Sequence, residues 1–134
     1  MKKDIEMPEV SGVYVAIIND SKSDEPEWSA YLINDKNEPI ENVFVSSKGY
    51  LTDIKGDETK SSTLRHFYKV VSAKSSQKIE AVIEDVFKLN NEYFVSFYHQ
   101  GTLFDKKFVF LPETIKRENL SQVPVLDSKG VWIK

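Results

Sequence analysis

The two histidines are the residues whose chemistry points most directly to acid–base catalysis or metal binding. His66 and His99 are the only histidines in the chain, and an imidazole changes its charge near neutral pH. Both lie in or beside a predicted strand, so they would approach each other if those strands pair. One hypothesis is therefore a small enzyme or metal-binding protein that uses His66 and His99 with a carboxylate. We favour the alternative, in which His66 is a hydrogen-bonded strand residue and His99 a turn residue.

The stretch VSSKGYLTDIKGDETKSSTLRHFYKV, residues 45–70, brings together cations, hydroxyl groups and two glycines. Such groups, with the backbone amides beside glycine, can hold a phosphate or a carboxylate. We therefore expect the 47–66 region to bind a protein partner or a small anionic ligand. The competing interpretation is a solvated connection of mixed charge. The candidate binding residues are Lys48, Tyr50, Lys55, Lys60, Arg65 and His66.

Motifs that would indicate catalysis are missing from the sequence. It contains no Gly-rich phosphate loop, no G-x-S-x-G elbow, no H-E-x-x-H pair and no cysteine. Asp20, Asp24 and Glu25 form an acid-rich turn, but their spacing matches no calcium-binding loop. We therefore expect a protein that is not an enzyme and has neither a metal nor a cofactor.

Composition and charge narrow the class of protein. A chain of 134 residues with 40% hydrophobic and 29% charged residues suits one globular domain. The absence of cysteine, and of any apolar run near bilayer length, predicts a cytoplasmic protein that does not interact with membranes. A pI near 5.4 argues against nucleic acid as a partner. Charge is uneven, however: residues 1–58 carry a net −7 and residues 59–134 a net +4.

Short β-branched and aromatic runs, separated by turn residues, predict the elements that position these side chains. Residues 47–63 form a long polar connection in which a small extra strand fits at 50–54. Residues 92–99 and 102–111 predict a hairpin whose turn is Gln100–Gly101, with Phe104, Lys106, Phe108 and Phe110 on one face. The seven predicted strands are 11–19, 28–34, 41–47, 63–71, 77–83, 92–99 and 102–111.

Two segments allow more than one structure. Residues 77–89 predict a strand at 77–83 and a short helical turn near 84–88, with one helix over 77–89 as the alternative. The end of the chain, VPVLDSKGVWIK, predicts either a small hairpin around 127–130 or a loose tail with an exposed Trp132. The domain boundaries that follow are a flexible N-terminus at 1–10, a β-sandwich at 11–114 and a C-terminal extension at 115–134.

The number and length of these strands predict an all-β fold. We expect an antiparallel sandwich of about seven strands, immunoglobulin-like or fibronectin-like. We expect such a scaffold to be a non-catalytic interaction or ligand-binding module, because loops on a rigid sandwich usually carry binding. A further alternative is self-association through the aromatic hairpin or an edge strand.

The runs WSAYLINDKNEPIENVFVSSKGY, STLRHFYKV and NNEYFVSFYHQGTLFDKKFVF resemble a group of short, uncharacterised bacterial β-sandwich proteins. Some of these similar sequences carry the label phenylalanyl-tRNA synthetase alpha subunit. The resemblance covers residues 11–114. A synthetase catalytic core needs a far longer chain and several arginines for ATP, whereas only Arg65 and Arg117 are present. The resemblance therefore implies a family and no mechanism.

Overall fold

The computed structural model describes residues 9–20 and 27–133. Most of the N-terminal segment predicted to be flexible, and most of the acid-rich turn at 20–25, lie outside these residues. Within the described part, no helix has the length and apolarity that crossing a bilayer requires.

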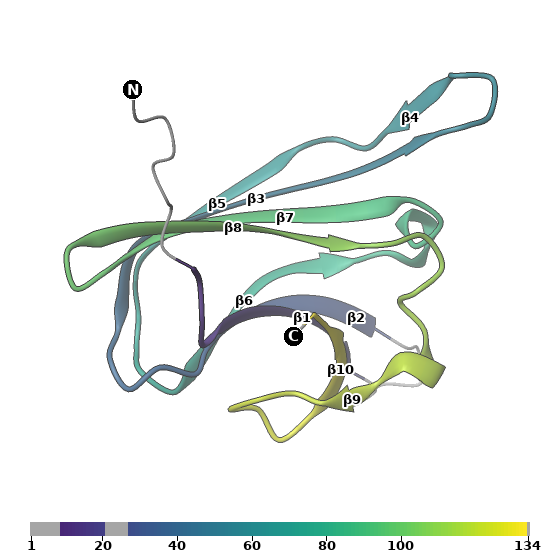
Figure 1. Cartoon of the computed structure of the whole chain (residues 1–134). Helices are drawn as coiled ribbons and strands as arrows, with labels where there is room; N and C mark the ends of the chain where they lie inside the picture. The colour runs from purple at the N-terminus through teal and green to yellow at the C-terminus, as the bar shows by residue number, and fades with distance from the viewer. Residues whose placement is uncertain (1–8, 21–26, 134) are drawn as a thin grey trace, which may run out of the picture.

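The described residues form two antiparallel sheets, which confirms the predicted all-β class. The first sheet has the order β6-β2-β1-β10-β9, and the second has the order β4-β3-β7-β8, with β5 also paired to β3. Figure 1 shows the sheets as two layers. The strands are β1 (Val13–Asp20), β2 (Glu27–Asn34), β3 (Ile40–Thr52), β4 (Glu58–Lys60), β5 (Leu64–Val71), β6 (Ser75–Val82), β7 (Asn90–His99), β8 (Thr102–Phe110), β9 (Ser121–Gln122) and β10 (Lys129–Trp132).

The main core lies between the two sheets, where alternating side chains of each strand point inward. Val43 and Val45 of β3 and Val95 and Phe97 of β7 are fully buried. They pack in one cluster with residues of the first sheet such as Val15. The expected aromatic face of β8 contributes as well, because Phe108 and Phe110 are buried in this core.

The C-terminal segment belongs to the first sheet. β10 pairs with β1, with Trp132 opposite Ala16, and also with β9. A second, smaller cluster forms on the other face of this sheet, where Val123 covers Ala16, Ile18 and Ile33. The alternative of a loose tail is therefore wrong. This covering also explains why both faces of β1 are apolar.

The predicted β7–β8 hairpin is confirmed. Gln100 and Gly101 have φ values of 51° and 80°, and two positive φ values are what the tight primed turns of hairpins require. The strand at 77–83 and the helical turn after it are also confirmed, as β6 and a short 3-10 helix, η1 (Glu84–Val86). A single helix over 77–89 is wrong, because β6 pairs with β2 along its length.

The long polar connection predicted at 47–63 is wrong, because most of it is a β-hairpin, and the small extra strand predicted at 50–54 is partly confirmed as the end of β3. β3 continues to Thr52, and Tyr50, Leu51 and Thr52 pair with β4. At the tip, the Asp53 carboxylate accepts hydrogen bonds from the backbone amides of Lys55 and Asp57. The arm formed by β3 and β4 extends beyond the rest of the second sheet (Figure 1).

Candidate functional site

The six predicted binding residues do not form one site. β3 and its neighbours alternate between the two faces of the second sheet, so they separate these side chains. Lys48, Tyr50 and Lys60 line a shallow hollow on the outer face. Lys55 lies at the exposed tip of the hairpin. The two remaining residues lie on β5, where Arg65 is exposed and His66 points to the inner side.

The outer hollow already contains paired charges. Lys48 Nζ lies 3.8 Å from Glu92 Oε2, and Lys107 Nζ lies 3.9 Å from Glu92 Oε1. Lys60 Nζ lies 3.5 Å from Glu58 Oε1. Desolvation and the nearby Glu92 carboxylate raise the pKa of Tyr50 above its usual value. Because carboxylates balance these lysines, the hollow is a weak site for a small anion.

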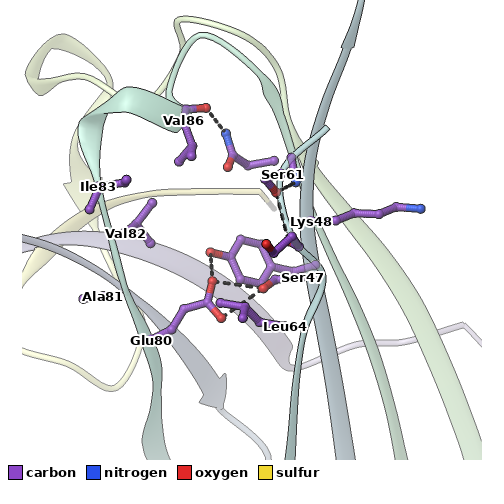
Figure 2. A pocket seen from close by; sticks show the side chains of 13 residues that line it. Ser47, Lys48, Ser61, Leu64, Glu80, Ala81, Val82, Ile83 and Val86 are labelled. Carbon is purple, nitrogen blue, oxygen red and sulfur yellow. Dashed lines mark hydrogen bonds between the residues drawn. The ribbon is translucent and has the colours of Figure 1, made fainter. Parts of the chain in front are cut away.

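A denser polar cluster lies on the inner side, around the carboxylate of Glu80. Ser47 Oγ lies 3.0 Å from both carboxylate oxygens, and Tyr93 Oη donates to Oε2 over 3.2 Å. His66 Nε2 lies 2.8 Å from Oε1. The Glu80 side chain is only 15% exposed and that of His66 25%. Figure 2 shows Glu80 directed toward Ser47 across the gap between the strands.

Strand register explains how these residues meet. Ser47 is opposite Leu64 on β5 and Tyr93 on β7, which puts all three on the inner face of the second sheet. Glu80 comes from β6, an edge strand of the first sheet. The pairing of β6 with β2 slips between Ala30 and Tyr31, which leaves Ile79 without a partner on β2. This bulge lets both Ile79 and Glu80 point inward.

Beside this cluster lies a pocket of about 290 Å³, which we call the Glu80 pocket. It opens between the edge strands of the two sheets, and η1 forms one side (Figure 2). Its apolar walls are Leu64, Ala81, Val82, Ile83 and Val86. Its polar lining residues are Ser47, Lys48, Ser61, Ser62, Glu80, Asn91 and Tyr93, and Gly49 completes it.

The buried tyrosine of this pocket is held in its neutral form. Burial raises the pKa of Tyr93 well above its usual value, and the charge and hydrogen bond of Glu80 raise it further. Burial and the Glu80 charge also raise the pKa of Tyr68, whose ring stacks on His66. At physiological pH the Tyr93 hydroxyl is therefore a hydrogen-bond donor to the carboxylate.

Ser47, His66 and Glu80 are the residue types of a hydrolytic triad, but they are connected in a different order. In a triad the nucleophile bonds to the base, and the base bonds to the carboxylate. Here Ser47 and His66 both bond to Glu80. The carboxylate thus occupies the centre of the network, an arrangement that positions donors and leaves the serine without an adjacent base.

The two histidines occupy separate sites. His99 Nε2 lies 3.0 Å from Glu38 Oε1, whereas His66 bonds to Glu80. His66 is opposite Val45, which is opposite Val95 on β7. His99 lies four residues further along β7, a distance of about 13 Å at the usual rise per residue. Among the described residues, no group of three or more His, Asp or Glu side chains could hold a metal ion.

Sequence reasoning missed Glu80, Ser47 and Tyr93 as members of one site. They come from three strands, and Glu80 belongs to the other sheet. The local signal was weak, because a single acid in a strand usually faces solvent. Only the bulge at Ile79 brings the carboxylate inside.

Comparison with known proteins adds no functional assignment. No protein-family model matches the chain, and the search of curated proteins finds no match. The proposals that follow therefore rest on the residues and their geometry.

Proposed function

We propose that this protein is a non-catalytic binding module that holds a small, mainly apolar ligand in the Glu80 pocket. The observation that carries the proposal is a shielded carboxylate, with three donors around it, at the side of a largely apolar pocket. Ligand sites are typically concave and apolar, with a few convergent polar groups that orient the ligand. A pocket of about 290 Å³ is near the lower end of the usual size range.

The carboxylate indicates the polar head of the ligand. An ionised carboxylate offers about four lone-pair directions. Ser47 has one hydroxyl hydrogen, so Ser47, Tyr93 and His66 together supply three hydrogen bonds. One acceptor direction is left for a ligand, which favours a donor such as an amine or a hydroxyl group. The Glu80 carboxylate would repel an anionic ligand. We therefore propose a ligand with a donor group in place of the small anionic ligand expected from the sequence.

The walls indicate the body of the ligand. Leu64 is 47% exposed and Ile83 is 65% exposed, although both are large apolar side chains beside the pocket. Apolar groups that remain exposed around a concave site favour an apolar ligand that would cover them. Burying this surface would contribute about 25 cal/mol per Å² of apolar area removed from water.

We further propose that the scaffold is a variant of the immunoglobulin-like sandwich, closest to the fibronectin-like type. In that architecture, strands A, B and E lie in one sheet and C, F and G in the other. The order β6-β2-β1 supports an E-B-A assignment, and the order β3-β7-β8 supports C-F-G. β5 pairs with β3 in place of joining the first sheet, and β9–β10 extend the sheet beyond β1.

Three probes with one shared ring test the chemistry of the pocket: benzylamine, benzyl alcohol and benzoate. Their dissociation constants can be measured by calorimetric titration. We expect benzylamine and benzyl alcohol to bind more tightly than benzoate. Glu80→Gln should weaken the binding free energy of benzylamine by about 1.5 to 3 kcal/mol, the usual contribution of a hydrogen bond to a charged group.

The apolar wall has a matched control. Ile83→Ser should weaken the binding of all three probes, whereas Ile54→Ser should leave the binding of each probe unchanged. Ile54 is fully exposed at the hairpin tip and does not line the pocket, so the chemical change is the same at a remote place. Tighter binding of benzoate than of benzylamine, or equal effects of the two serine variants, would refute the proposal.

A further inference from the structure

The outer face of the second sheet carries three phenylalanines on adjacent strands. Phe67 on β5 is directly opposite Phe44 on β3. Phe94 on β7 is diagonal to Phe44, because it is opposite Ser46 while Phe44 is opposite Ser96. Such neighbours lie about 5 Å apart directly and about 7 to 8 Å apart diagonally. Phe67 is 62% exposed, and the other two rings are partly exposed.

Cations surround these rings. One row across the sheet reads Arg65, Ser46, Phe94 and Lys107, from β5 to β8. Lys48 occupies the next row along β3, opposite Glu92. We call this surface the Phe44 face, and it consists of Phe44, Phe67, Phe94, Lys48, Arg65 and Lys107. All three cations are exposed.

The charge on this face is positive although the chain is acidic. Its carboxylates are Glu92, which lies between Lys48 and Lys107, Asp105, opposite Ser96, and the exposed Glu41, opposite Tyr98 in the next row. Arg65 forms no ion pair within the described residues, and the exposed Lys69 follows two positions after Phe67. The basic residues of the face, other than Lys48, come from the half of the chain that carries the net +4.

We propose that the Phe44 face binds single-stranded nucleic acid, independently of the Glu80 pocket. Exposed rings on a sheet offer stacking surfaces to unpaired bases. Arg65 and Lys69, which form no ion pair within the described residues, can contact the phosphates, whereas Lys48 and Lys107 share the single carboxylate of Glu92. The rings and Arg65 would also suit a protein partner, but the lysines favour nucleic acid, because lysine is depleted from protein–protein interfaces. The pI of the whole chain predicts no nucleic-acid binding, but it averages this face with the acidic remainder.

The test is fluorescence anisotropy with labelled oligothymidylate and oligouridylate of about 12 nucleotides, within the range of single-strand site sizes. Phe67→Ala should raise the dissociation constant about tenfold, as expected for the loss of one stacking ring. Phe67→Tyr should restore most of the affinity, because it keeps a flat ring. Phe67 is largely exposed, so both variants should fold.

The ionic part of the proposal is tested by salt dependence. Arg65→Ala should lower the slope of log affinity against log salt by about 0.7, the value for one contact with a single-stranded phosphate. Arg117→Ala is the matched control, because Arg117 is an exposed arginine in the short 3-10 helix η2 (Arg117–Asn119), outside this sheet.

Three results would overturn the inference. The first is the absence of binding to either oligonucleotide at low salt. The second is that the wild type, Phe67→Ala and Arg65→Ala all bind the oligonucleotides with the same affinity. The third is that polyglutamate displaces the labelled oligonucleotide as well as an unlabelled oligonucleotide of the same charge does. That result would assign the face to acidic proteins.

Discussion

At the scale of single residues, the Glu80 carboxylate organises the inner site. It accepts hydrogen bonds from a buried serine and a buried tyrosine and pairs with a half-shielded histidine. Losing one of these donors leaves lone pairs of a shielded carboxylate unsatisfied, which costs more than an ordinary exposed hydrogen bond. Both the stability of the site and its selectivity for donors therefore depend on this one group.

The raised pKa of Tyr93 predicts a pH dependence of stability. In the unfolded chain the phenol ionises near pH 10, whereas in the folded chain it stays protonated to higher pH. The folded state thus binds more protons above pH 10, and its free energy of unfolding falls there as pH rises. We expect a loss of about 1.4 kcal/mol per pH unit from this group.

Urea unfolding of the wild type and Tyr93→Phe at pH values from about 9 to 11 measures this contribution, in the range where tyrosine titrates. The variant should be less stable at neutral pH, and the difference should shrink above pH 10. Tyr98→Phe is a control on the same strand, because the Tyr98 ring is exposed. A constant difference across the range would contradict the assigned role of Tyr93.

At the scale of elements, β3 carries both proposed surfaces. Ser47 faces the Glu80 pocket and its neighbour Ser46 faces outward, while Lys48 lines both that pocket and the outer hollow. Sequence reasoning merged these sides into one candidate site because it interpreted residues 47–63 as a connection. In a loop, neighbouring side chains can converge. In a strand they alternate, so the same residues divide between two faces.

The strands themselves were largely predictable, because β-branched and aromatic runs and their turn residues are local signals. The β7–β8 hairpin follows from such patterns, whereas the pattern of β6 fits a helix as well as a strand. The bulge at Ile79 depends on the pairing of β6 with β2, which lies far away in the sequence, so no local pattern reports it. The inner site depends on that bulge, and for this reason it was not predicted.

Gly130 tests how tightly the C-terminal strand is attached. A Cβ at this position would lie 2.9 Å from the backbone oxygen of Ile17 on β1. Gly130→Ala should therefore separate β10 from β1 and destabilise the fold by about 1 to 3 kcal/mol, as overpacking usually does. Urea unfolding and hydrogen exchange at Ile18, which pairs with Gly130, measure the effect.

Ser128→Ala is the control for this prediction, because Ser128 is exposed in the loop before β10. It should leave stability and exchange unchanged. An alanine at Gly130 without a measurable cost would show that β10 moves freely relative to β1.

At the scale of the whole molecule, the sandwich separates two kinds of recognition. The Glu80 pocket opens between the sheets and presents a carboxylate in apolar surroundings. The Phe44 face lies on the outside of the second sheet and presents rings and cations. The net charge of −3 describes neither surface, because it averages over both. Whole-chain composition therefore predicts the class of fold better than it predicts the partners.

The central claim is that a small ligand with a donor group binds in the Glu80 pocket. Its most direct test is a fragment screen that follows the backbone amide signals of the labelled protein by NMR. The account predicts that amine and alcohol fragments shift the signals of residues 47–49, 61–64, 80–86 and 91–93 together, and that Glu80→Gln abolishes the shifts caused by amines. Shifts confined to other surfaces, or shifts at the pocket that carboxylate fragments cause more strongly, would contradict it.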